Sequence, residues 1–240
     1  MTGSEERVVG LTGAAGFVGK QVLRQLLSSG CRVRAIVRAG SAPRIPVSTG
    51  RLEVVEVDDL FDAPPNTLRE ALDGVHTLVH AAWYAEPGKY LHHPRNVECL
   101  TGTLRLGATF GEVGGRRFIG LGTCFEYDLA SGLLRVETPL RPTTLYAACK
   151  VAAFEVLGPL LAAKGVELAW CRLFYLYGEG EDVRRLVPYV RSRLAAGEPV
   201  ELTAGDQVHD YLDVVEAGRL IAETALSATL GAVNVCSGVP

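Results

Sequence analysis

The segment "RVVGLTGAAGFVGK", residues 7–20, decides the fold. It begins with "RVVGLT" (7–12), a short β-branched and apolar run of the kind that forms a buried strand. The apolar spacing of 16–30 then predicts a helix that ends at a glycine. Between strand and helix the chain turns through three glycines, Gly13, Gly16 and Gly19. A strand that passes through a glycine turn into a helix predicts the first unit of a doubly wound parallel sheet.

The remaining sequence alternates strand and helix patterns in the same way. Further strands are predicted at 31–38, 52–59, 76–83, 116–123, 166–173 and 232–238. Helical spacing covers 94–114, 143–165 and 211–226. We expect Gly158-Pro159 to interrupt the second of these helices. Apolar strands separated by helices predict the α/β class, with a doubly wound parallel sheet of the Rossmann type.

The alternation loosens after Leu173, and this sets the predicted domain organisation. We expect a dinucleotide-binding domain over 1–175 and a small substrate-binding excursion over 176–205. Residues 206–240 then return to the sheet. Because the sequence stops at Pro240, directly after a predicted strand and turn, we expect the natural chain to continue.

The composition excludes several classes of partner. With 240 residues, 48% of them hydrophobic, the chain can bury one large core. A net charge of −3 and scattered arginines leave no basic surface for nucleic acid. The N-terminus lacks the pattern of a signal peptide, and the apolar stretches are shorter than the roughly 20 residues of a membrane helix. We predict a cytoplasmic protein with no membrane partner. The six cysteines lack the close spacing of a metal site, so we predict free thiols and no metal.

The glycine turn is a candidate cofactor site. Glycine allows a sharp turn and close approach of the backbone to a pyrophosphate, which then lies at the positive N-terminus of a helix. A tight turn without a ligand is the alternative, but the position after the first strand favours a dinucleotide. The residues predicted to contact it here are Gly13, Ala15, Gly16, Phe17, Val18 and Gly19.

The end of the second strand indicates which dinucleotide binds. An NAD site usually has a carboxylate about 20 residues beyond the glycines. This chain has Arg38 there, with Arg44 nearby and no acid, and arginine matches a 2′-phosphate. NADP is therefore favoured and NAD is the second choice, unless the arginine is simply solvated. After the third strand we expect cofactor contacts from Asp58, Asp59 and Leu60, although the acids could instead cap a turn.

The segment "LYAACK" (145–150) places Tyr146 four residues before Lys150, so both side chains share one helix face. A free phenol has a pKa of about 10. We expect a neighbouring ammonium to lower the pKa of Tyr146, which could then exchange a proton with a carbonyl or an alcohol. Thr123, at the end of a predicted strand, could hydrogen-bond the same oxygen. An exposed amphipathic pair is the alternative.

Eight segments in order give a resemblance to a known family. They are "GAAGFVG", "HAAW", "NVECLTGT", "GTCFEY", "YAACK", "RLFYLYGEGE", "QVHDYLDVVEAG" and "NVCSG", and they extend over nearly the whole chain. The sequence resembles the extended short-chain dehydrogenases/reductases, in the group of NAD(P)-dependent nucleotide-sugar epimerases and dehydratases. The resemblance implies an enzyme that acts on a nucleotide-sugar, and a homodimer formed through the helices at 94–114 and 143–164.

The resemblance also implies roles for individual residues. Tyr146 is the acid/base, Lys150 modulates its pKa and binds the nicotinamide ribose, Thr123 is the Ser/Thr partner, and Asn96 supports the lysine through water. Cofactor contacts are implied for His80, Ala81, Ala82 and Phe174. Substrate contacts are implied for Trp83, Cys124, Phe125, Tyr175, Arg185 and His209. His209 stands where the family has arginine and Tyr175 where it has asparagine, which leaves the sugar undefined.

The residues after Thr123 reduce the number of reactions that the chain could catalyse. Resembling dehydratases have Asp-Glu there, whereas this chain has Cys124 and Phe125, and phenylalanine cannot transfer a proton. Cys124 could act in a 3,5-epimerase/reductase, although a packed thiol is favoured. The Arg38 argument for NADP weighs against a 4-epimerase. We therefore predict NADPH-dependent reduction of a nucleotide-linked, by resemblance dTDP-linked, 4-keto-6-deoxyhexose. A non-catalytic NADP(H) sensor is an alternative of another class.

Overall fold

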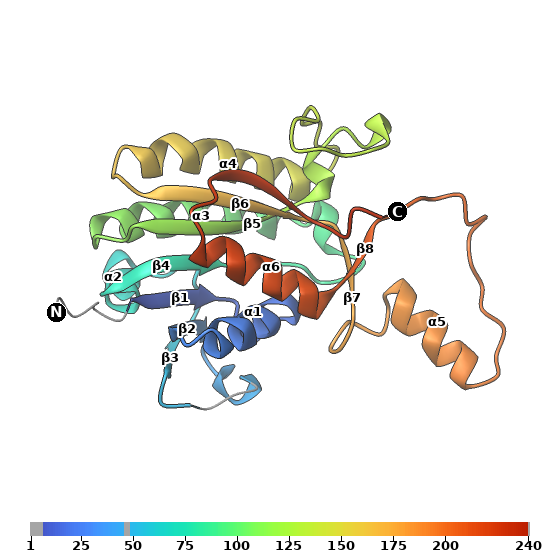
Figure 1. Cartoon of the computed structure of the whole chain (residues 1–240), viewed down its shortest axis with the longest axis horizontal. Coiled ribbons are helices and arrows are strands. Elements are labelled where there is room, and N and C mark those ends of the chain that lie inside the picture. Colours follow the sequence, from blue (N-terminus) through green and yellow to red (C-terminus); the bar gives the residue numbers. More distant parts are fainter. Residues whose placement is uncertain (1–6, 46–48, 240) are drawn as a thin grey trace.

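The computed structural model describes residues 7–45 and 49–239. Its centre is a seven-stranded parallel sheet (Figure 1). The strand order is β3 (Leu52–Val57), β2 (Arg32–Arg38), β1 (Val8–Thr12), β4 (Val75–His80), β5 (Arg117–Thr123), β6 (Glu167–Leu173) and β9 (Gly231–Val235). The order reverses at β1, because β2 follows it on one side and β4 on the other. Such a reversal opens a crevice at the carboxyl ends of the strands, where ligands bind in doubly wound sheets.

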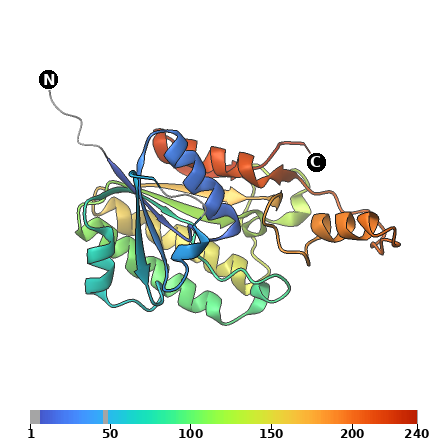
Figure 2. The same cartoon turned by 90° about the horizontal axis from the view of Figure 1, so that it is seen from below.

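Helices cover both faces of the sheet (Figures 1 and 2). One face packs against α1 (Phe17–Ser28) and α6 (Val214–Leu226) in a core of aliphatic side chains. The other packs against α2 (Pro65–Leu72), α3 (Arg95–Glu112) and α4 (Leu145–Ala162), with Phe110, Phe118 and Trp170 among its largest side chains. Because both faces are covered at the centre of the sheet, the central strands β1 and β5 are almost wholly buried and their sequences are largely apolar, whereas most of β3, at the edge, is exposed or half-buried. The predicted fold class is confirmed.

Some predicted elements differ from the structure, and some short elements were not predicted. The predicted interruption of the helix at Gly158-Pro159 is wrong, because α4 continues to Ala162. Pro159 has no N–H to donate to the carbonyl of Glu155, so this helical hydrogen bond is lost. Because Glu155 and Pro159 are both exposed, water can bond to the carbonyl instead. The strand predicted over 76–83 ends at His80. Helix α2, only eight residues long, was not predicted.

A small second layer lies beyond the carboxyl edge of the sheet. It consists of β7 (Tyr175–Tyr177) paired in parallel with β8 (Tyr211–Asp213), and of α5 (Leu186–Ala195), which projects from the body of the molecule (Figure 2). The predicted helix over 211–226 therefore begins as a strand. This layer places aromatic side chains beside the crevice.

Among the described residues a single helix, α4, has the length and apolar composition that a membrane crossing would require. In the structure it packs against α3, β5 and β6.

Candidate active site

The crevice holds a cleft of about 520 Å³ that joins the glycine turn to the tyrosine of α4. Its lining includes residues of the glycine turn and the end of β4, namely Gly13, Gly16, Phe17, Val18, Gly19 and Ala81. It also includes Trp83, Thr123, Cys124, Phe125, Tyr146, Phe174, Tyr175 and Arg185. The topology thus brings predicted cofactor, catalytic and substrate residues from distant parts of the chain into one cleft.

The glycine turn has features that fit a pyrophosphate. Gly13 has a φ of +72°, and a Cβ on it would lie 2.7 Å from the nitrogen of Ala82, so packing alone requires this glycine. A Cβ on Gly19 would lie 2.1 Å from the oxygen of Gly13. Gly16 is different: it faces the cleft and a Cβ there would meet only the Gly13 oxygen, at 3.2 Å. Gly16 also begins α1 without a side-chain cap, and no acid lies in the first turn. The amides of this helix end can therefore bind an anion.

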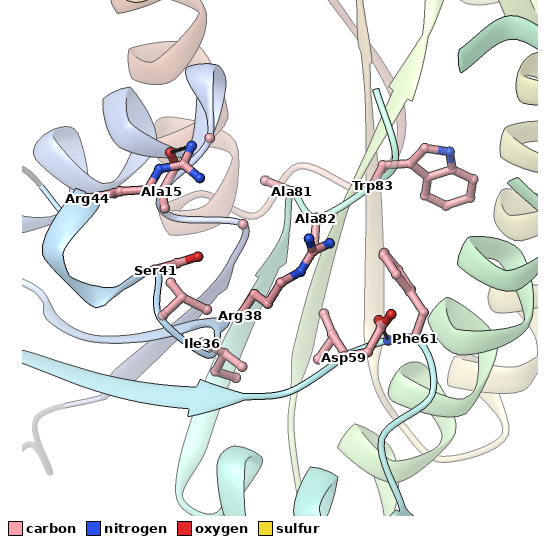
Figure 3. A pocket seen from close by; sticks show the side chains of 14 residues that line it. Ala15, Ile36, Arg38, Ser41, Arg44, Asp59, Phe61, Ala81, Ala82 and Trp83 are labelled. Carbon is pink, nitrogen blue, oxygen red and sulfur yellow. Dashed lines mark hydrogen bonds between the residues drawn. The ribbon is translucent and has the colours of Figure 1, made fainter. Parts of the chain in front are cut away.

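A second cavity of about 290 Å³ adjoins the glycine turn, and Ala15, Arg38, Leu60 and Ala82 line it (Figure 3). Ser41 and Arg44, which were not among the predicted contacts, line it as well. Arg44 donates to the oxygen of Ala15 at 3.4 Å. The lining includes the guanidinium groups of Arg38 and Arg44, which could hold an anionic part of a dinucleotide.

The two predicted acids behave differently. Asp59 lines this cavity, but its carboxylate pairs with Arg95 and accepts a hydrogen bond from the amide of Phe61 at 3.0 Å. It therefore caps the turn after β3, which was the alternative prediction. Asp58 is exposed and is not part of the cavity lining, and its predicted contact with the cofactor stays a prediction.

The side chain of His80 has a structural role in the core. It is buried, with Nδ1 2.8 Å from the Thr12 hydroxyl and Nε2 2.8 Å from the Thr103 hydroxyl. Burial, together with the Lys150 charge, lowers the pKa of His80 to about 3, so the ring is neutral. It joins β4 to β1 and α3. The side chain of His80 points into the core, whereas Ala81 and Ala82 line the cavity. The predicted cofactor contact of His80 stays a prediction.

Tyr146 and Lys150 lie on one face of α4, and each has a different environment. Tyr146 lines the cleft edge-to-face with Tyr90, with ring centroids 4.8 Å apart. Lys150 is buried deeper, and its Nζ donates to the carbonyl of Leu121 at 2.6 Å. The ammonium lies 3.7 Å from the centroid of the Trp83 ring and 5.8 Å from that of Tyr146.

The predicted direction of the Tyr146 pKa shift is wrong for this arrangement. Burial raises the pKa of Tyr146 well above its ordinary value; Tyr90 and Glu126 raise it further, and the hydrogen bond with Thr123 acts in the opposite direction. Burial also lowers the pKa of Lys150 to about 7, with a smaller opposing effect from Glu126. Desolvation thus outweighs the attraction expected from sequence spacing. The phenol is protonated at neutral pH and can donate its proton.

Thr123 is fixed by a buried ionic network. Its amide donates to Oε1 of Glu126 at 2.9 Å, and its hydroxyl accepts from the amide of Phe125 at 3.3 Å. Glu126 is fully buried and pairs with Arg172 at 2.6 Å, while Trp170 donates to the same carboxylate at 3.0 Å. Sequence reasoning missed Glu126 because its partners lie 44 and 46 residues away.

Asn96 does not contact Lys150 directly. Its side-chain amide donates to the carbonyls of Tyr90 and His93 at 2.6 and 2.9 Å, and its oxygen accepts from the Trp83 indole at 2.8 Å.

On the substrate side, His209 is displaced from the cleft. It stacks on Tyr175 with ring centroids 4.0 Å apart and lines a neighbouring groove of about 350 Å³. Glu181 lines the cleft and was not predicted. Its Oε2 is buried without a hydrogen-bond partner among the described residues, and burial raises the pKa of this carboxyl.

The six cysteines are free thiols. Burial raises the pKa of Cys124 to about 12. In the described ranges, no cluster of three or more histidine, cysteine or acidic residues could hold a metal ion.

Comparison with known proteins gives consistent matches. The model of the NAD dependent epimerase/dehydratase family matches residues 9–236. The chain is 24% identical over 232 residues to dTDP-6-deoxy-L-talose 4-dehydrogenase (NAD(+)) of Aggregatibacter actinomycetemcomitans, covering 96% of this chain and 84% of that one. It is 27% identical to dTDP-6-deoxy-L-talose 4-dehydrogenase (NAD(P)(+)) of Kitasatospora kifunensis, covering 87% and 66%. Among solved structures it is similar to MoeE5 in complex with UDP-glucuronic acid and NAD, with a TM-score of 0.79, 27% identity, and coverage of 95% and 76%.

Proposed function

Because the chain belongs to the NAD dependent epimerase/dehydratase family, we propose that it reduces the 4-keto group of a nucleotide-linked 4-keto-6-deoxyhexose with NADPH. The family and its relatives make the chain an NAD(P)-dependent oxidoreductase that modifies nucleotide-sugars. The reaction, the sugar and the preference for NADPH are our proposal. The observation that carries it is the position of a protonated Tyr146 beside Thr123, in the cleft that contains the glycine turn.

The chain's own residues provide binding and proton transfer. The amides at the start of α1 would hold the pyrophosphate, and Arg38 and Arg44 the 2′-phosphate. NADPH, when bound, supplies the hydride. Tyr146 donates its proton to the sugar carbonyl oxygen, and the Thr123 hydroxyl donates a hydrogen bond to the same oxygen. A phenol whose pKa is raised stays protonated at neutral pH, so Tyr146 is in the form that can donate a proton.

Other chemistries lack the residues that they need. Phe125 lies in the cleft where a dehydratase would need an acid or base. Cys124 is a buried thiol packed directly after β5, which weighs against it as the acid of a 3,5-epimerase. Two curated relatives exchange hydride at the 4-position of a dTDP-6-deoxyhexose, as their names state. This supports ketoreduction at the same carbon.

The test is a steady-state assay with NADPH and a dTDP-4-keto-6-deoxyhexose. We expect stoichiometric oxidation of NADPH and a product heavier by two hydrogens. A product of unchanged mass, formed without net use of NADPH, would instead identify an epimerase. Saturable NADPH binding with no turnover of any keto-sugar would identify a sensor.

A further inference from the structure

The Lys150 ammonium lies on the ring of Trp83, an aromatic residue that has no role in the proposed reaction. Its Nζ lies 3.7 Å from the centroid of the Trp83 indole, which is close contact for a cation on a π face. The only hydrogen bond seen for this ammonium among the described residues runs to the carbonyl of Leu121, at 2.6 Å. The Leu121 carbonyl and the Trp83 ring therefore take the place of the water molecules that would surround the Lys150 ammonium in solution.

The indole is itself held in place. Its Nε1–H donates to the oxygen of Asn96 at 2.8 Å. The Asn96 amide is fixed in turn by the carbonyls of Tyr90 and His93, at 2.6 and 2.9 Å. The ring also contacts Tyr146 edge-to-face, with centroids 6.4 Å apart. Asn96 and Trp83 are therefore two members of one rigid unit that ends at the ammonium.

The other groups around Lys150 do little to stabilise its positive charge. Among the described residues, Glu126, in the turn after β5, is the carboxylate whose charge acts on it, and that carboxylate is already paired with Arg172. Cys99 on α3 and Cys149 on α4 are thiols, and His80 on β4 is neutral. Tyr146, on the same helix, is a protonated phenol. The π face of Trp83 is thus the main group with negative electrostatic potential near the ammonium that is not already paired with another cation.

We propose that Trp83 is the positioning residue of this site: its indole, held by Asn96, carries the Lys150 ammonium on its face and keeps it charged beside Tyr146. Asn96 then acts on the lysine through the indole ring instead of through a water molecule. The proposal rests on the proposed function only for its kinetic test.

The kinetic test is the pH dependence of kcat for ketoreduction. Tyr146 stays protonated far above neutrality, so the basic limb reports loss of the Lys150 charge. In Trp83→Met, which keeps an apolar cover but removes the ring, we expect the midpoint of this limb to fall by about one pH unit. Trp83→Phe should lower it by less. Phe110→Leu, a core aromatic substitution remote from Lys150, is the control and should leave the midpoint unchanged.

The second test requires neither turnover nor a variant of Trp83. The chain has two tryptophans, so ¹⁵N-labelled protein gives two indole N–H signals. The signal that responds to Asn96→Asp is assigned to Trp83. It should shift with pH near neutrality in the wild type and remain constant in Lys150→Met.

These outcomes decide the proposal. An unchanged midpoint in Trp83→Met, or one that moves to higher pH, would overturn it, because the ring would then act only by excluding water. An indole signal that does not titrate, or titrates equally in Lys150→Met, would also overturn it. Absence of ketoreduction with a titrating indole would refute the proposed function alone.

Discussion

Replacing Glu126 with glutamine should destabilise the fold more than the same replacement of a glutamate at the surface. The carboxylate is fully buried and accepts from Arg172, Trp170 and the amide of Thr123 at 2.6, 3.0 and 2.9 Å. Glutamine preserves the shape but removes the charge, so the Arg172 guanidinium, only 2% exposed, stays buried without a counter-ion.

The expected cost follows from this geometry. Removing one partner of a buried ion pair typically costs about 3–5 kcal/mol. Glutamine keeps one oxygen as an acceptor, so we expect the lower end, about 3 kcal/mol, or roughly a 150-fold change in the unfolding equilibrium. Arg34 and Glu53 form a pair of similar length, 2.7 Å, but the Glu53 side chain is 56% exposed. Glu53→Gln should therefore cost less than about 1 kcal/mol.

Urea unfolding, followed by circular dichroism, measures both variants against the wild type at neutral pH. The double variant Glu126→Gln/Arg172→Met should regain part of the loss, because it removes the unpaired cation. If Glu126→Gln costs no more than Glu53→Gln, the buried network does not hold the end of β5. The account of how Thr123 is positioned would then be refuted.

Three further predictions concern the cofactor, the thiol and the lysine. Arg38→Ala should weaken NADPH binding by at least tenfold and NADH binding by less than threefold in calorimetric titration, and equal losses would remove the argument for NADP. Cys124→Ala should retain kcat within about threefold, because the proposed reaction takes its proton from Tyr146 and the buried thiol only packs after β5, and a loss of a hundredfold would contradict this. The pKa of Lys150 is lowered to about 7 from 10.5, so the native state releases this proton before the unfolded state does. The free energy of unfolding of the wild type, relative to Lys150→Met, should therefore be lowest below pH 7 and rise above it by at most about 1.4 kcal/mol per pH unit. A constant difference across this range would show that the lysine is not desolvated.

The parts of the fold that depend on local pattern could be predicted from the sequence. Buried parallel strands give continuous apolar runs, and the glycine turn at 13–19 identified the first strand and helix correctly. The shortest helix, α2, was missed because eight residues give too little periodicity. The effect of Pro159 was misjudged because its cost depends on exposure, which the sequence does not record.

In the candidate site, the sequence spacing predicted that Tyr146 and Lys150 lie close together, but not how their surroundings shift the pKa of each. Tyr146 and Lys150 share a helix face, as four-residue spacing requires. The sign of their pKa shifts is set mainly by burial, with a smaller effect of Glu126, and neither can be seen from the spacing of the two residues. His80 illustrates the same limit, since the side chain at a strand end can face a ligand or the core.

The most direct test of the central claim is Tyr146→Phe, which removes one oxygen from the cleft and leaves the ring in place. The account predicts that reduction of the keto-sugar by NADPH slows by at least a hundredfold, while the dissociation constant for NADPH changes by less than threefold. Turnover within threefold of the wild type would show that the proton comes from another group, and the assignment of Tyr146 as the acid would be abandoned.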